Sequence, residues 1–426
     1  MFENHLIPSL MFFSTVFVAF TGIAPSLNIA LVGILFGLFF VGSDLFLRIP
    51  SLIYDTIYNL NWLSIPLAIF FSYLARHLIS LEELLILWKI LKKRGLFSII
   101  IFPIPLNSIF TGLIGGTGPI SSLENLSFFK KINTVKLDIN FIVLNQLIFI
   151  SLIPPSLILI ILVNSTGANT TQFFIAIIFP AFLYGLICQV FFFWYLKKVF
   201  TKLGTSVSSI KTEKKLLVLK LASPYFFLIG FFIIMFNELL SLNQMLSFGI
   251  LIISIFLIVN KKNHCKTIFV AGYKKTGMLS GIIFFSYLCA QFFLESFRSL
   301  GGDDFILSEI SKVSSDANIQ LIIILTIVFL LQFLFTWLEI SFVLVPILIP
   351  VISFLDIDIV WFLVMICFSF HNLAFFTPLG INSTSFWKKY KTASTSKYIK
   401  PYLTLVLFKF TILTLVFFNK NFFIGN

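Results

Sequence analysis

The sequence predicts an all-α, polytopic membrane protein built from two repeats of opposite orientation. Of its 426 residues, 59% are hydrophobic and only 11% are charged, whereas about a quarter of the residues in a soluble domain are charged. Apolar spans need roughly 20 residues each, so the apolar content allows about a dozen, of which we expect about ten to be transmembrane helices. This composition excludes an ordinary cytosolic enzyme, a disordered chain and a disulfide-rich secreted module. The repeat is predicted by the positions of the basic clusters along the chain.

Stretches without Asp, Glu, Lys or Arg mark the candidate membrane segments. Two of them, 4–43 and 139–196, are too long for one span, and they divide near Ala24–Pro25–Ser26 and near Asn164–Thr171. The other stretches are 56–75, 95–123, 221–237, 239–260, 276–294, 317–338, 340–355 and 359–387, with a last apolar run after Pro401.

The loops between these stretches indicate orientation. Cytoplasmic loops are enriched in Lys and Arg, and the net charge of +13 comes from lysine clusters between apolar runs. The stretch 298–316 is acidic and is predicted to lie outside. The clusters predicted to lie inside are Lys89–Arg94, Lys130–Lys136, 197–220, Lys261–Lys275 and Lys388–Lys400.

Two segments are predicted to enter the membrane and turn back. Segment 95–123 has basic clusters on both flanks and contains a run of small residues, Gly112–Pro119, that breaks a helix. We therefore expect a re-entrant helical hairpin that enters from the cytoplasm. Segment 317–355, with Pro346 and Pro350, begins after the acidic loop and is expected to form a hairpin that enters from outside.

This topology gives the same order of elements twice. Residues 1–196 and 221–426 each contain three spans, a hairpin and two spans, and the basic cytoplasmic linker 197–220 joins them. Because the first half starts outside and the second starts inside, the repeat is inverted. Inverted repeats with broken helices at their interface are the architecture of secondary transporters.

Several polar groups are candidates for chemistry at membrane depth. The hairpin tip Gly112–Ser122 exposes backbone groups and hydroxyls that would suit a cation, although small residues also serve tight helix packing. Ile153–Ser156 and Phe376–Gly380 predict a broken helix after each hairpin. Glu339 is either a functional carboxylate or a structural acid that accepts hydrogen bonds from a turn.

Other charged groups are interpreted as structural. Glu295 and Arg298 are expected to form a pair near the outer membrane edge, and Gly301–Asp304 is expected to form a loop turn. No Lys or Arg is predicted near the midplane. A membrane enzyme would need acidic or histidine clusters at one face, and the sequence has no HExxH, Walker A or GxSxG motif. We therefore expect a protein that is not an enzyme.

The motifs, in their order, resemble the large permease subunit of tripartite ATP-independent periplasmic (TRAP) transporters, in the mannitol, chloroaromatic or dicarboxylate-like branch. The residues that carry the resemblance are GLIGGTGPI at 112–120, LIPPSLIL at 152–159, FRSLGGDDFI at 297–306, WLEISFVLVPILIPVI at 337–352, IDIVWF at 357–362 and FFTPLGIN at 375–382.

The resemblance implies an elevator-type, sodium-coupled importer of a small organic anion, a carboxylate, in the bacterial inner membrane. Its partners would be a periplasmic solute-binding protein and a small four-helix membrane subunit; Na+ would be the coupling ion, with no cofactor and no nucleic acid. The implied ion-binding residues are Gly116, Thr117, Gly118, Ser121, Glu339, Ser341, Thr377 and Gly380. The implied substrate-binding residues are Pro119, Ser122, Pro155, Ser156, Pro378 and Asn382.

The chain departs from the family pattern at three places. Thr377–Gly380 is one residue shorter than the usual Thr-Pro-Pro-x-Gly, Thr336 replaces a common Asp, and Gln146–Ser151 replaces a lead-in of small residues. An alternative function therefore stays open: an organic-anion or proton-coupled exchanger of the same superfamily that works without partners and uses Glu339 as the proton carrier.

Overall fold

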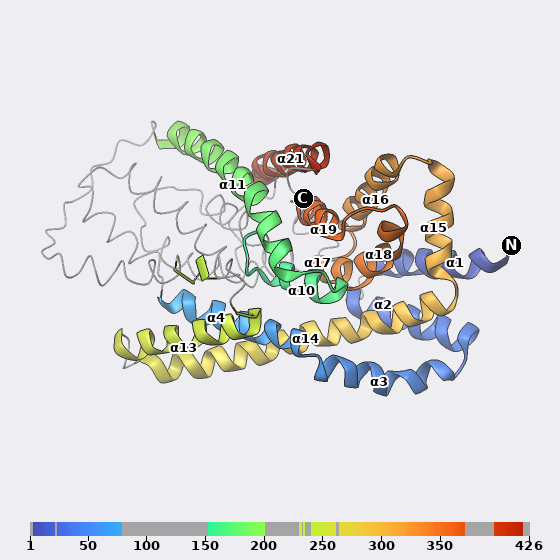
Figure 1. Ribbon diagram of the computed structural model, residues 1–426, viewed down its shortest axis with the longest axis horizontal. Helices are drawn as coiled ribbons and strands as arrows, with labels where there is room; N and C mark the ends of the chain where they lie inside the picture. The colour runs from blue at the N-terminus through green and yellow to red at the C-terminus, as the bar shows by residue number, and fades with distance from the viewer. Residues whose placement is uncertain are drawn as a thin grey trace, which may run out of the picture. The chain divides into compact units, whose positions relative to one another are not determined.

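The computed structural model describes residues 3–21, 24–78, 152–200, 230–231, 233–234, 240–260, 264–370 and 396–420. Every regular element in these ranges is helical, as predicted (Figure 1). The hairpin 95–123, the linker beyond residue 200 and the segment 371–395 lie outside the described residues, so the inverted repeat stays a prediction.

The described residues belong to two compact units, each with segments from both predicted repeats. One unit comprises Met1–Trp62, Ile161–Asn169 and Leu279–Asn426, and the other comprises Leu63–Ile160 and Thr170–Met278. The helices formed by the described residues are α1 (Glu3–Ala19), α2 (Pro25–Phe36), η1 (Gly37–Val41), α3 (Asp44–Tyr58), η2 (Leu60–Leu63), α4 (Ser64–Leu78), α10 (Leu157–Thr166), α11 (Thr170–Phe200), α13 (Leu242–Asn260), α14 (Cys265–Ser299), α15 (Gly302–Val313), α16 (Ala317–Leu331), α17 (Trp337–Glu339), η4 (Ile340–Leu344), α18 (Val345–Phe354), α19 (Ile359–Ser369) and α21 (Ser396–Phe418).

Four helical stretches of the described chain are long and apolar enough to cross a membrane. They are Thr170–Phe191, Leu242–Val259, Cys265–Ser299 and Trp337–Phe354. The pair α15 and α16, bent by 119°, would make a fifth. Several helices are shorter than the roughly 20 residues that a span needs, including α2, α10 and α19. The protein is therefore a polytopic helical membrane protein with interrupted helices.

The predicted breaks in the two longest apolar runs are confirmed. The chain leaves α1 at Ala19 and begins α2 at Pro25, where a proline is tolerated because the first turn of a helix needs no amide donor. It leaves α10 at Thr166 and begins α11 at Thr170, through Gly167 with a φ of 71°. Proline and small polar residues therefore located these breaks correctly.

Two predicted loops are wrong. Lys266, Lys274 and Lys275 lie on α14, a helix of 35 residues, about 52 Å long. The acidic stretch that starts at Gly301 forms α15, with Gly301 as its N-cap at a φ of 79°. Counting charges misassigned both segments because lysine is a good helix former, and because Asp303 and Asp304 lie in the first turn of α15, where acidic side chains stabilise a helix.

The unit that contains Glu339 is held together where α2 crosses α14. A Cβ atom on Gly33 would lie 2.7 Å from the backbone Cα of Phe293, so only glycine permits this approach. The Ser296 hydroxyl donates to the Gly33 carbonyl at 2.8 Å. On the other face of α2, the Asn28 side chain donates to the Thr15 carbonyl of α1 at 2.9 Å. The close backbone contact and the two buried hydrogen bonds thus fix how α1, α2 and α14 are aligned against one another.

The ion pairs around α14 differ from the predicted pair of Glu295 with Arg298. Glu295 pairs with Arg48 of α3 at 3.4 Å, and Arg298 pairs with Asp303 of α15 at 3.6 Å. Arg298 also donates to the Pro346 carbonyl at 3.3 Å. The two residues are therefore not partners, because neighbouring helices supply a counter-charge to each.

In the second unit, α4 packs along α13. A Cβ atom on Gly249 would lie 2.6 Å from the Phe71 ring and 2.8 Å from the Phe231 ring, and these rings stack with centroids 4.8 Å apart. The glycine therefore makes room for an aromatic pair between the helices.

Replacing Gly33 with alanine is expected to force α2 away from α14. Overpacking of this kind costs about 1–3 kcal/mol, and the clash involves backbone that cannot rotate away. Thermal unfolding in detergent should show a lower Tm for Gly33→Ala. The matched control is Gly281→Ala on α14, where an added Cβ meets nothing within 4 Å; equal Tm values for the two variants would contradict the packing described here.

Candidate ion-coupling site

The predicted break within 317–355 is present, and it lies just before Glu339. The helix α16 ends at Leu331, residues 332–336 turn, and α17 begins at Trp337. Thr336 and Glu339 form a capping box: the Thr336 hydroxyl accepts from the Leu338 amide at 3.3 Å, and the Glu339 carboxylate accepts from the Thr336 amide at 3.0 Å. The structural role that the sequence left open for Glu339 is therefore real.

The chain continues from this capping box as one interrupted helix. A π-helical segment, η4, follows Glu339 and leads into α18, where Pro346 lies in the first turn and Pro350 inside the helix. Such segments often occur at functional sites. The turn therefore precedes Glu339 and Ser341, and neither proline ends the helix.

The Glu339 carboxylate has two further partners, a hydroxyl of α2 and the hydroxyl of its own N-cap residue. Its Oε1 atom accepts from the Ser26 hydroxyl of α2 at 2.7 Å, and its Oε2 atom accepts from the Thr336 hydroxyl. Ser26 also lies 2.9 Å from the Ser286 hydroxyl of α14. Because the single Ser26 proton goes to the carboxylate, Ser286 must donate to Ser26. The hydroxyls thus form a chain that ends at Glu339.

Glu339 has no cationic partner in the ion pairs of the described residues, which are Arg48–Glu295, Arg298–Asp303 and Lys312–Glu309. The residue is only 7% exposed. Burying a charge without a counter-charge is costly, and a cation from solution bound beside the carboxylate would offset that cost. The carboxylate and the three neighbouring hydroxyls supply the oxygen atoms that hard cations take as ligands.

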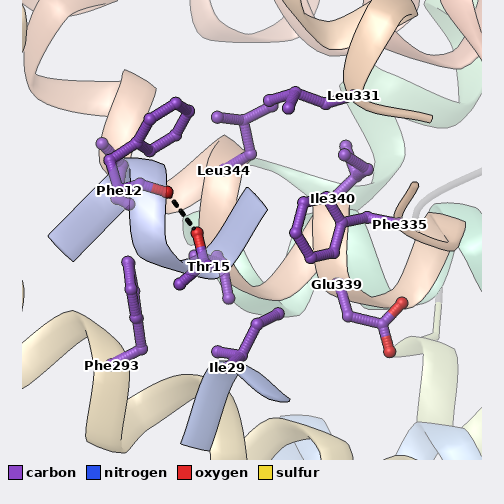
Figure 2. Close-up of a pocket in the computed structure, with 11 residues that line it drawn as sticks. Phe12, Thr15, Ile29, Phe293, Leu331, Phe335, Glu339, Ile340 and Leu344 are labelled. Carbon is purple, nitrogen blue, oxygen red and sulfur yellow. Dashed lines mark hydrogen bonds between the residues drawn. The ribbon is translucent and has the colours of Figure 1, made fainter. Parts of the chain in front are cut away.

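A small cavity of about 30 Å³ lies beside this cluster (Figure 2). Its lining is mainly apolar, with Phe12, Ile29 and Phe293 among the side chains. The Thr15 hydroxyl donates to the Phe12 carbonyl at 2.6 Å, and the Glu339 carboxylate points away from Thr15 (Figure 2). The cavity has room for about one water molecule, and the carboxylate lies at its edge.

Three aromatic rings contact one another, and two of them lie close in the chain to Ser286 and Glu339. Trp62 lies with its ring centroid 4.2 Å from that of Tyr287 and 6.0 Å from that of Phe342. Tyr287 follows Ser286 on α14, and Phe342 lies in η4 after Glu339. Trp62 and Phe342 are buried. The neighbours of Ser286 and Glu339 along their helices thus belong to a buried aromatic cluster.

A second polar cluster lies where α19 ends, and the sequence reasoning missed it. Lys409 of α21 is 7% exposed, and its ammonium group donates to the Phe370 carbonyl at 2.7 Å. Gln332, in the turn before Glu339, donates to the Ser369 carbonyl at 3.3 Å. Lys409 is therefore a buried lysine within an apolar helix, and the expectation that no Lys or Arg lies near the midplane stays a prediction. The available signal was one lysine in the otherwise apolar run 403–418.

Four of the residues predicted for binding are described. Glu339 and Ser341 lie on the same helical stretch, and Ser341, fully buried, donates to the Trp337 carbonyl at 2.7 Å. Pro155 and Ser156 lie in the other compact unit, where Ser156 precedes α10 and is buried. The predicted residues outside the described ranges are Gly116, Thr117, Gly118, Pro119, Ser121, Ser122, Thr377, Pro378, Gly380 and Asn382.

Interrupted helices that hold ionisable groups in buried positions are typical of membrane transport proteins. The family model for the DctM component of the tripartite ATP-independent periplasmic transporter matches residues 148–420, and the chain belongs to this family. The match includes Glu339 and Lys409. Members of the family are transporters, so the chain is assigned to transport and not to catalysis. No curated protein matches the chain.

Removing the Ser26 hydroxyl is expected to destabilise the cluster, because it deprives a buried carboxylate of one donor. The loss should be about 1–3 kcal/mol in the free energy of unfolding. Denaturant titration of Ser26→Ala in mixed micelles measures it. Ser51→Ala is the control, since the exposed Ser51 hydroxyl bonds only within its own helix, to the Arg48 carbonyl at 2.7 Å. A Ser26→Ala variant as stable as this control would contradict the assigned hydrogen bond.

Proposed function

We propose that the chain is the large permease subunit of a TRAP-type secondary transporter that couples the entry of Na+ to the uptake of a small organic anion, a carboxylate. The family match supports the transporter class. Support for ion coupling comes from Glu339, a buried carboxylate at a broken helix, surrounded by hydroxyls and without a cationic partner in the ion pairs of the described chain.

The partners and location belong to the same proposal. A periplasmic solute-binding protein delivers the substrate, a small four-helix membrane subunit completes the complex, and the complex lies in the bacterial inner membrane. The predicted ion and substrate residues around Gly116–Ser122 and Thr377–Asn382 lie outside the described ranges and are retained as proposals, together with elevator motion.

Because of its position, an ion that binds to Glu339 would change the contact between α2, α14 and α17. Its carboxylate connects α2, α14 and the start of α17 through Ser26, Ser286 and Thr336. A cation bound to the carboxylate changes which way these hydroxyls point, and with it the energy of the three-helix contact. By linkage, a substrate that favours one arrangement of these helices raises the affinity for the ion, and the ion raises the affinity for the substrate equally.

Uptake by reconstituted complex tests sodium coupling. The chain and its two partners are placed in liposomes, and a labelled carboxylate that raises the Tm of the binding protein serves as the substrate. We expect uptake only with an inward sodium gradient. Glu339→Gln should raise the sodium concentration for half-maximal uptake about tenfold or more, since losing a charged partner costs at least about 1.4 kcal/mol.

The control for Glu339→Gln is Glu309→Gln, which changes an exposed carboxylate that pairs with Lys312 three residues away. Uptake that does not respond to the sodium gradient would refute the coupling. If Glu339→Gln shows the same sodium dependence as the wild type, Glu339 takes no part in the coupling.

The hydroxyl chain from Ser286 through Ser26 to Glu339 also favours a second function, in which a proton replaces sodium and the chain exchanges organic anions without partners. Hydroxyl chains that reach a carboxylate conduct protons when their members reorient. This function predicts uptake driven by a pH gradient without sodium or binding protein, and loss of that dependence in Glu339→Gln. An unchanged pH dependence would exclude Glu339 as the carrier.

A further inference from the structure

The helix α19 ends within the membrane, near its midplane. It has 11 residues, which span about 16 Å, or half of the roughly 30 Å hydrocarbon core. Its start has the marks of a membrane surface: Asp358 caps the helix, Asp356 is exposed, and the ammonium group of Lys420 lies 5.3 Å from the centroid of the Trp361 ring. Its other end, Phe370, therefore lies about one half-bilayer deeper.

The helix α21 brings Lys409 to that buried end. The Trp361 side chain donates to the Val416 carbonyl at 3.1 Å, and Lys409 donates to the Phe370 carbonyl, so the two helices lie side by side and antiparallel. Residues 361–369 are all buried. Lys409 is thus seven residues from Val416, about 10 Å along α21 toward the middle of the membrane.

The buried end of α19 attracts positive charge. The last four carbonyl groups of a helix have no partner within it, and the aligned peptide dipoles place about half a negative charge there. Gln332 satisfies the Ser369 carbonyl as a neutral donor. The Phe370 carbonyl instead receives the ammonium group of Lys409. In transporters with broken helices, the carbonyl ends of half-helices are the places where coupling cations bind.

We propose that Lys409 is a built-in cation, whose ammonium group permanently occupies the carbonyl end of α19 so that this end takes no ion from solution. What this means for transport rests on the proposed function. The end of α19 then binds none of the ions that drive transport. Among the described residues, Glu339 is the only buried acid left to bind a coupling ion. A neutral side chain at 409 should convert the end of α19 into a sodium site.

The test measures thermal unfolding of the full chain in lipid nanodiscs, in sodium chloride and in choline chloride of equal concentration. Lys409→Met keeps the length of the side chain and removes the charge. We expect this variant to unfold at a lower temperature than the wild type in choline, and its sodium-dependent rise in Tm to be at least twice that of the wild type. Lys420→Met changes an exposed lysine just beyond α21 and removes its contact with the Trp361 ring, so any loss of stability should be equal in both salts and the sodium-dependent rise in Tm should match that of the wild type.

Two further variants separate charge from hydrogen bonding. Lys409→Arg keeps the charge and should give no added response to sodium. Lys409→Gln keeps a donor without the charge, and it serves as the test if Lys409→Met does not fold; it should gain the sodium response. Equal destabilisation of the neutral variants in both salts, or wild-type stability in choline, would overturn the proposal.

The assay contains no substrate, so its outcome is independent of transport. The sodium response of the wild type reports on Glu339 and therefore on the proposed function. The additional response of the Lys409 variants reports on the end of α19 alone.

Discussion

Helix ends that lie at membrane depth need partners for their backbone groups, because the surrounding hydrocarbon offers none. In the unit that contains Glu339, the start of α17 and the end of α19 both have such partners. At the start of α17, the Thr336 hydroxyl and the Glu339 carboxylate receive amide donors. At the end of α19, Gln332 and Lys409 supply donors for two carbonyls. The start of α17 thus has an acidic partner and the end of α19 has a basic one, in agreement with the direction of the helix dipole.

The two helix ends are connected to each other. Gln332 belongs to the turn that precedes Glu339, and its side chain reaches the Ser369 carbonyl at the end of α19. A movement of this turn therefore changes the surroundings of both the carboxylate and the carbonyl that receives Lys409. The close contact of Gly33 with Phe293 holds α2 and α14 nearby, so Ser26 and Ser286 stay within reach of Glu339. The site depends on packing as much as on its polar residues.

The sequence predicted the class, the helical fold and several breaks, because composition, proline and small polar residues act locally. It placed Glu339 among the candidate residues, since an acid in an apolar stretch stands out. It missed Ser26, Ser286 and Gln332, whose roles arise from contacts between segments far apart in the chain. It missed Lys409 because the antiparallel pairing of α19 with α21 brings that lysine to the end of α19. The rule that basic residues mark loops also failed for α14, where three lysines are helical.

The central claim is that the end of α19, with Lys409, lies near the middle of the bilayer. Nitroxide labels on exposed positions of α21 measure depth directly through their relative accessibility to oxygen and to a water-soluble nickel chelate. Leu407, 63% exposed, is two residues from Lys409, and Phe418, 81% exposed, lies at the end of the helix. The label at 407 should be near the bilayer centre and the label at 418 about 16 Å closer to the headgroups. A label at 407 that is as accessible to the nickel chelate as the label at 418 would contradict the account.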